Sequence, residues 1–257
     1  MFQRSLARLS VRCQKMMLLS REDIALEHVI KAQRKDITLI QEPFPHVIID
    51  DFFTPLQYQK MCAEFRRCKA MGLSKDINEK GKFRPFEIDY DGYLFSPTPT
   101  IDPKAPFSFL FTIAWNRFFS KLFGQLTTME TSTGMHHHPS GNRTGFVHSD
   151  FVLKYFSPIH RLSNGVTPFD EPKKETGIPR RRIISLIFFL DNDGWKEGDG
   201  GETGIYKDKQ TLLKKVAPIN NRLFAFQIND KSLHAFQANF TDRNSIVQWF
   251  HIPDELR

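Results

Sequence analysis

The chain is poor in cysteine and contains no long apolar run. Its 257 residues include three cysteines, Cys13, Cys62 and Cys68, whose odd number and spacing fit neither a disulfide framework nor a zinc site. We therefore expect reduced thiols and a reducing, cytoplasmic environment. A transmembrane helix needs roughly 18 or more consecutive apolar residues, and no stretch approaches this length, so the sequence predicts no membrane partner.

Acidic residues are missing from the first 20 positions. Basic residues recur there about every four positions, at Arg4, Arg8, Arg12 and Lys15. A mitochondrial transit peptide has this composition, but so has an ordinary basic N-terminal helix, and a mitochondrial location therefore stays open as an alternative. The rest of the chain carries 32 basic and 29 acidic residues, a balance that argues against a nucleic-acid partner.

Apolar residues, by contrast, are plentiful. They make up 40% of the sequence, and 25 residues are phenylalanine, which is enough to fill one sizeable core. The length suits one large domain with a short extension. We expect a basic leader and an N-terminal helix over residues 1–42, followed by the folded domain over residues 43–257.

Helical periodicity appears mainly in the first half of the chain. The pattern predicts a helix over residues 21–35 and a second one that begins after Thr54 and ends near Gly72. A third, Phe107–Phe123, has a broad aromatic stripe and Gly124 as its C-cap. We expect the third helix to brace the back of a sheet.

The second half of the chain has the texture of β-structure. Short β-prone runs separated by turn residues occur at Gly145–Phe156, Ile183–Leu190, Glu202–Tyr206, Leu223–Gln227, His234–Ala238 and Ser245–His251. Helices followed by strands predict an α+β domain in which the helices support a β-sandwich or jelly roll. Residues 157–182 indicate a long surface loop of the kind that often forms a lid, and residues 136–138, three histidines in a row, indicate a flexible loop at the rim of the site.

His148 and Asp150 are the start of a candidate metal site. On an extended strand, side chains at positions i and i+2 point to the same face, so both can reach one ion. Two histidines and one carboxylate bind non-haem Fe(II) and leave further coordination positions open. His234, on a later predicted strand, is the best candidate for the missing ligand. Arg243, nine residues further on, can clamp a carboxylate of a cosubstrate in bidentate fashion.

With this pattern of candidate ligands and arginine, the chain resembles a known family, the prolyl 4-hydroxylase-like branch of the 2-oxoglutarate/Fe(II)-dependent dioxygenases. The matching pieces occur in the family's order: PFPHVIIDDFF at 43–53, HSD at 148–150, RIISLIFFLDNDGW at 182–195, GDGGETGIY at 198–206, PINNRLFAF at 218–226, His234 and RNSIVQWF at 243–250. The resemblance implies a double-stranded β-helix with iron near one open end.

The resemblance also implies roles for individual residues. It assigns the iron to His148, Asp150 and His234, and the salt bridge to 2-oxoglutarate to Arg243, with Ser245 as a helper. Many members of the family have a tyrosine before the turn where this chain reads Phe188–Asp191, and its hydroxyl binds the cosubstrate. Here the phenol is missing, and the candidate replacements are Tyr155, Ser185 and Thr203.

The activity that the resemblance implies is hydroxylation of a C–H bond, most simply in an amino-acid side chain. Fe(II) and 2-oxoglutarate would serve as cofactor and cosubstrate, with ascorbate as a candidate additional cofactor, and succinate and CO₂ would be coproducts. O₂ and an unknown protein or small molecule are the expected partners. Two alternatives stay open: a catalytically silent jelly-roll binding module, and an oxygenase for a nucleic-acid base or small metabolite.

Overall fold

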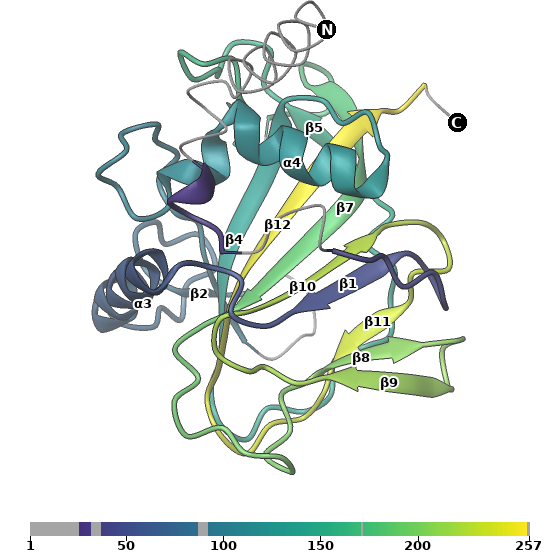
Figure 1. The fold of residues 1–257 in the computed structure, drawn as a ribbon. Coiled ribbons are helices and arrows are strands. Elements are labelled where there is room, and N and C mark those ends of the chain that lie inside the picture. The colour runs from purple at the N-terminus through teal and green to yellow at the C-terminus, as the bar shows by residue number, and fades with distance from the viewer. Residues whose placement is uncertain (1–25, 32–36, 87–91, 171, 256–257) are drawn as a thin grey trace, which may run out of the picture.

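The computed structural model describes residues 26–31, 37–86, 92–170 and 172–255 (Figure 1). The basic segment 1–20, Cys13 and most of the helix expected over residues 21–35 lie outside these ranges. None of the described helices has the length and apolar character that would let it cross a membrane. Cys62 and Cys68 are both buried free thiols, as expected.

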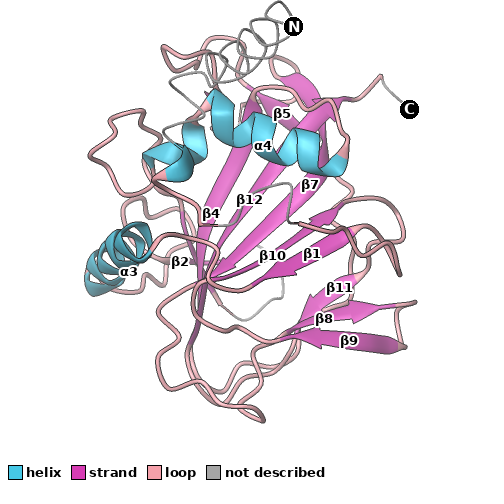
Figure 2. Ribbon diagram, viewed as in Figure 1, coloured by secondary structure: helices cyan, strands magenta, loops and turns pink. Residues whose placement is uncertain are grey.

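Two mostly antiparallel sheets face each other in the described part of the chain (Figure 2). The larger runs in the order β1-β10-β7-β12-β4-β3-β2, with β5 added to β7 and β6 to β4. Its strands are β1 (His46–Ile49), β2 (Arg84–Pro85), β3 (Tyr93–Phe95), β4 (Glu130–His138), β5 (Leu153–Phe156), β6 (Thr167–Pro168), β7 (Ile178–Phe189), β10 (Arg222–Gln227) and β12 (Arg243–Pro253). The smaller sheet joins β11 (His234–Phe236), β8 (Thr203–Tyr206) and β9 (Leu212–Val216) in that order.

Strand β7 shows how the core is built on both sides of the larger sheet. Successive side chains on a strand point to opposite faces. Ile184 and Phe188 accordingly join the cluster behind the sheet, whereas Ile187 and Phe189 join a second cluster that also contains residues of β8 and β9. Because both faces are buried, the strand reads as a continuous apolar run. The second cluster packs the two sheets together, which makes the domain a double-stranded β-helix, or jelly roll.

Two helices support the larger sheet, as the sequence predicts. The first, α3 (Pro55–Ala70), begins at a Thr54 cap, whose hydroxyl accepts from the amide of Gln57. The second, α4 (Ile113–Phe123), ends at Gly124, which has a φ of 64° in the left-handed region that favours glycine. Figure 1 shows α4 lying across the sheet over β4, β12 and β7.

The helix expected to start at Phe107 starts later. Ser108–Phe111 form a 3₁₀ turn, η2, and the extended Thr112 then separates this turn from α4. The reason is local, because the Thr112 hydroxyl caps the amide of Trp115 and a capping residue cannot itself be helical. Trp115 faces the sheet, where its indole nitrogen donates to Gln248 on β12 at 2.7 Å.

Three expectations about strands and loops are wrong in detail. The histidines at 136–138 do not form a flexible loop, since they are the end of β4 and pair with both β3 and β12. Only Leu153–Phe156 of the strand expected over 145–156 forms β5. The loop expected over 157–182 ends earlier, because β7 already begins at Ile178, where it pairs with β5, and because β6 pairs with β4 inside the loop.

Candidate metal centre

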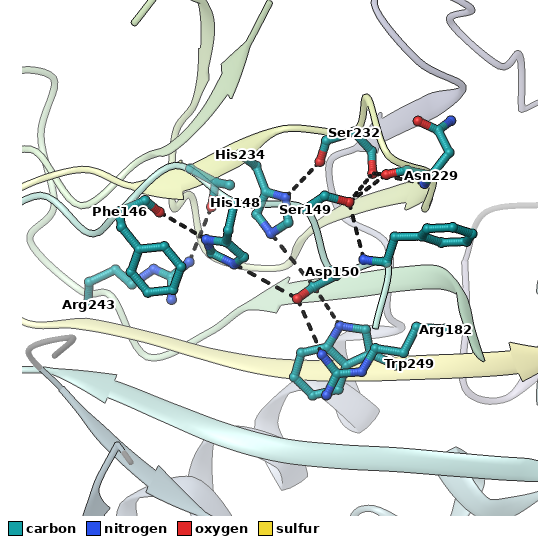
Figure 3. A network of polar contacts seen from close by, with 12 residues as sticks. Phe146, His148, Ser149, Asp150, Arg182, Asn229, Ser232, His234, Arg243 and Trp249 are labelled. Atoms are coloured by element: carbon teal, nitrogen blue, oxygen red, sulfur yellow. Dashed lines mark hydrogen bonds and ion pairs between the residues drawn. The ribbon is translucent and has the colours of Figure 1, made fainter. Parts of the chain in front are cut away.

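Three potential metal ligands converge where the two sheets meet. His148 lies in an extended stretch before β5, and its backbone pairs with that of His234, the first residue of β11, through hydrogen bonds of 2.9 and 3.0 Å. Asp150 completes the group, with carboxylate oxygens 3.8 Å from His148 Nε2 and 3.7 Å from His234 Nε2. The ligand atoms all lie within 4.8 Å of one another (Figure 3), which is close enough for one ion.

Ser149 explains why the two outer residues of the triplet reach the same point. Its hydroxyl donates to the carbonyl of Asn229 at 2.5 Å and accepts from the amide of Phe151 at 3.1 Å. These contacts hold the middle residue away from the triad (Figure 3). In an extended backbone His148 and Asp150 must then point to the opposite side, where the metal would lie.

Both histidines present the nitrogen that a metal needs. Nδ1 of His148 lies 2.9 Å from the carbonyl oxygen of Phe146, and Nδ1 of His234 lies 3.0 Å from that of Ser232. A carbonyl oxygen only accepts hydrogen bonds, so each Nδ1 carries the hydrogen, and in a neutral ring the lone pair is on Nε2. The neutral form is favoured at His234, because burial lowers its pKa to about 4, although Asp150 acts in the opposite direction.

The carboxylate of Asp150 is held by two donors. The indole nitrogen of Trp249 donates to Oδ2 at 2.6 Å, and Nη1 of Arg182 donates to Oδ1 at 3.3 Å. The guanidinium of Arg182 in turn stacks on Trp249, 3.9 Å from the ring centroid. Burial alone would raise the pKa of Asp150, but Arg182, the two histidines and Trp249 together lower it to about 2. The carboxylate is therefore ionised and fixed in orientation.

Arg243 lies on the inner face of β12, where it begins the strand as predicted. It is buried, with 4% of its surface exposed. Nη1 donates to the hydroxyl of Ser245 at 2.7 Å, and Nη2 lies 3.3 Å from that of Thr203. The guanidinium also lies over the ring of Phe189, 5.0 Å from its centroid. These contacts fix the plane of the guanidinium, which is the condition for bidentate binding of a carboxylate.

One cavity of about 490 Å³ joins the triad and Arg243. Thr203, one of the three candidate replacements for the missing phenol, lines it as well. The other two do not. Ser185 is completely buried in β7, and Tyr155, on β5, is not among the residues that line the cavity.

Sequence reasoning missed three residues that line this cavity. Trp249 had a usable signal, because it is six residues after Arg243 on the same strand and therefore on the same face. Arg182 was assigned to a loop and His136 to a flexible tract, so neither was considered. Phe169, from the segment between β6 and β7, also lines the cavity and is the contribution of the expected loop to it.

The donor set fits Fe(II). Two imidazoles and one carboxylate on one side of an ion leave further positions for a cosubstrate and O₂. Arg243, elsewhere on the wall of the same cavity, supplies a buried cation in a fixed plane, which suits the distal carboxylate of a dicarboxylic acid.

Comparison with known proteins agrees with this donor set. Residues 133–251 match the 2OG-Fe(II) oxygenase superfamily. None of the curated protein sequences is similar enough to count as a match.

Several solved structures share the fold. A Pseudomonas putida prolyl-4-hydroxylase is 18% identical, with a TM-score of 0.54, over 80% of this chain and 91% of that one. A Trichoplax adhaerens prolyl hydroxylase, in complex with a hypoxia inducible factor peptide fragment, is 14% identical with a TM-score of 0.52, over 80% and 83%. A viral collagen prolyl hydroxylase from Paramecium Bursaria Chlorella virus-1, in complex with 2OG, is 14% identical with a TM-score of 0.51, over 80% and 95%.

Proposed function

We propose that this chain, whose residues 133–251 match the 2OG-Fe(II) oxygenase superfamily, hydroxylates a C–H bond in an amino-acid side chain. The protein is an Fe(II)- and 2-oxoglutarate-dependent dioxygenase that consumes O₂. Which residues carry the reaction, and on which substrate, is the proposal developed below. The observation that carries it is the presence of a two-histidine, one-carboxylate triad and a buried arginine in one cavity.

His148, Asp150 and His234 are proposed to hold the iron. The support is chemical: each histidine binds a backbone carbonyl through Nδ1 and so offers Nε2, and the carboxylate is ionised. Held there, Fe(II) with 2-oxoglutarate would supply the activation of O₂, in which one oxygen atom would go to the substrate and the other to succinate, with release of CO₂.

Arg243 is proposed to bind the distal carboxylate of 2-oxoglutarate. Ser245 and Thr203 hold the guanidinium by hydrogen bonds to its two terminal nitrogens. The arginine is thus fixed before the cosubstrate arrives, which reduces the entropy lost on binding.

Arg182 and Trp249 are proposed as positioning residues for Asp150. Each donates to a different oxygen of the carboxylate, and they stack on each other, so neither can move without disturbing its partner. Partners of this kind orient a metal ligand and tune its affinity for the ion. Asp150 is the only carboxylate in the triad, so its orientation decides where the single negative charge of the three ligands lies relative to the ion.

The rest of the wall keeps the reaction dry. Apolar side chains that line the cavity are Phe146, Val152, Leu153, Phe169, Ile187, Phe236 and Val247. Excluding water strengthens the charged contacts inside the cavity and protects reactive species from side reactions. Phe146 is both part of this wall and the residue whose carbonyl binds His148.

An amino-acid side chain is the proposed substrate because the similar structures include one in complex with a peptide and one described as a collagen hydroxylase. A catalytically silent binding module is not favoured, since the triad and Arg243 are all present and lie in one cavity.

A decarboxylation assay tests the proposal. The purified chain is supplied with Fe(II), 2-oxoglutarate and O₂, and succinate is measured with peptides, free amino acids, nucleic acids and small metabolites in turn. We expect a peptide or an amino acid to stimulate succinate release in the parent chain but not in Asp150→Ala. Stimulation by a nucleic acid or another metabolite alone would contradict the substrate class, and no release above the Asp150→Ala background would contradict the whole proposal.

A further inference from the structure

His136 is a cavity residue that the proposed function leaves without a role. It lies on β4, directly opposite Ser245 in the register with β12, and so on the inner face of the sheet. Its ring packs edge-on against Phe86, with centroids 4.9 Å apart, and lies 6.3 Å from the ring of Trp249. A Cβ at Gly134 would come within 3.3 Å of His136 Nε2, so the glycine two residues earlier leaves room for the ring.

The hydrogen bonding of His136 differs from that of its neighbours. Among the residues that the structure describes, neither of its ring nitrogens has a hydrogen-bond partner, although part of the ring faces the cavity. His137, the next residue on β4, points to the other face and binds the side chain of Asn244 at 2.7 Å. His148 and His234 each bind a backbone carbonyl. His136 is partly buried and lines the cavity, so its open ring nitrogens are available to a ligand there.

The charge state of His136 decides what it can offer. Burial and, next, the positive charge of Arg243 lower its pKa to about 3, and Asp150 opposes this only in part. The ring is therefore neutral at physiological pH and has one N–H donor and one acceptor nitrogen. Arg243 and Asp150, at the two ends of the proposed site, both act on it electrostatically, and all three residues line the same cavity.

We propose that His136 is a further cosubstrate-binding residue, whose imidazole N–H donates a hydrogen bond to a carboxylate of 2-oxoglutarate. This inference rests on the proposed function. The residue under the Arg243 guanidinium is Phe189, and a phenyl ring has no donor to offer at that end of the cavity. Phe189 on β7 and His136 on β4 both lie opposite Ser245 of β12, one on each side of that strand. His136 therefore supplies a donor next to the position where Phe189 has none. The role is one of binding and orientation, since His136 is not among the three clustered metal ligands and the neutral ring does not need to titrate.

The test measures 2-oxoglutarate binding without turnover. The full-length chain is loaded with Mn(II), which replaces iron without redox chemistry, and is titrated with 2-oxoglutarate in a calorimeter in the absence of any primary substrate. A hydrogen bond to a charged group is worth roughly a 10- to 100-fold change in affinity, so His136→Leu should weaken binding by about that factor. His136→Gln, which keeps an N–H donor, should recover much of the loss. His137→Leu, the same change on the opposite face of β4, should bind 2-oxoglutarate like the parent chain.

The outcomes separate this inference from the proposed function. If the Mn(II)-loaded parent chain does not bind 2-oxoglutarate, the proposed function is wrong and this inference with it. If the parent binds and His136→Leu binds equally well while retaining Mn(II), only the role of His136 is wrong. Loss of Mn(II) from both His136→Leu and His136→Gln, but not from His137→Leu, would also overturn it, because the residue would then serve the metal.

Discussion

The two faces of the larger sheet differ in what their polar side chains meet: the packed core on one face and an open cavity on the other. On the face that α4 covers, Gln248 is fully buried, accepts from the indole of Trp115 at 2.7 Å and donates to Thr131 at 2.9 Å. On the cavity face, Nε of Arg182 is buried without a hydrogen-bond partner among the described residues, and the partly buried ring of His136 has no such partner there either. Completed polar contacts stabilise a fold, whereas an open position on a cavity wall is available to a ligand.

Strand β12 carries both kinds of group at once. Its odd-numbered residues, among them Arg243 and Trp249, face the cavity, and its even-numbered residues, among them Gln248, face α4. The same strand can therefore be altered on one face to change binding and on the other to change stability. Variants on the two faces should therefore separate ligand binding from stability.

The largest effect is expected at the proposed metal ligands. His234→Ala should abolish stoichiometric Fe(II) binding, because the loss of one of three protein ligands leaves water to complete the site, and His148→Ala should do the same. Asp150→Ala should weaken binding strongly. Equilibrium binding of Fe(II) under anaerobic conditions measures this. If all three variants bound iron like the parent chain, the ligand assignment would be wrong.

The next largest effect is expected at Arg243. A bidentate, charge-assisted contact contributes on the order of 2–3 kcal/mol, so Arg243→Ala should raise the apparent constant for 2-oxoglutarate about 30- to 150-fold. Arg243→Lys should recover only part of the affinity, since an ammonium group is not a planar fork. Titration of the cosubstrate during turnover measures the constant, and an unchanged value in Arg243→Ala would disprove the role.

A smaller effect is expected at Trp249. The change Trp249→Phe keeps a ring for Arg182 to stack on but removes the donor to Asp150 Oδ2. Residues that hydrogen-bond to metal ligands typically contribute 10- to 100-fold to metal affinity. Because Arg182 still holds the carboxylate, we expect Trp249→Phe to weaken Fe(II) binding by about 10-fold. Competition with a chelator measures the affinity for Fe(II). Parent-like affinity would show that the indole does not position the carboxylate.

The smallest effect on the site is expected from the opposite face. Gln248→Leu leaves the indole nitrogen of Trp115 buried without its acceptor, which should reduce the free energy of unfolding by about 1–3 kcal/mol. Iron and cosubstrate affinities should stay within about twofold of the parent, because Gln248 does not line the cavity. Denaturant unfolding measures the expected loss of stability, and the binding assays for iron and 2-oxoglutarate measure the expected unchanged affinities. A large loss of affinity with intact stability would contradict the division between the two faces.

Local features of the fold were predictable from local sequence. The cap at Thr54, the glycine that ends α4 and the apolar run in β7 all act through neighbours a few positions away, and the structure confirms each. The same holds for the paired orientation of His148 and Asp150, which follows from extended backbone alone. The sequence-based prediction was wrong where secondary structure depends on the neighbouring strands. Residues 136–138 are the end of β4 because β3 and β12 pair with them on either side.

The sequence by itself determined an α+β domain with a β-sandwich or jelly roll and the residue types for a two-histidine, one-carboxylate site, because periodicity and spacing along an extended chain are local properties. Only the tertiary structure decided what surrounds that site. Arg182 and Trp249 reach Asp150 across 32 and 99 residues of chain, and His136 enters the cavity through its pairing with Ser245. Such contacts depend on which strands lie side by side, and no spacing along one chain encodes that directly.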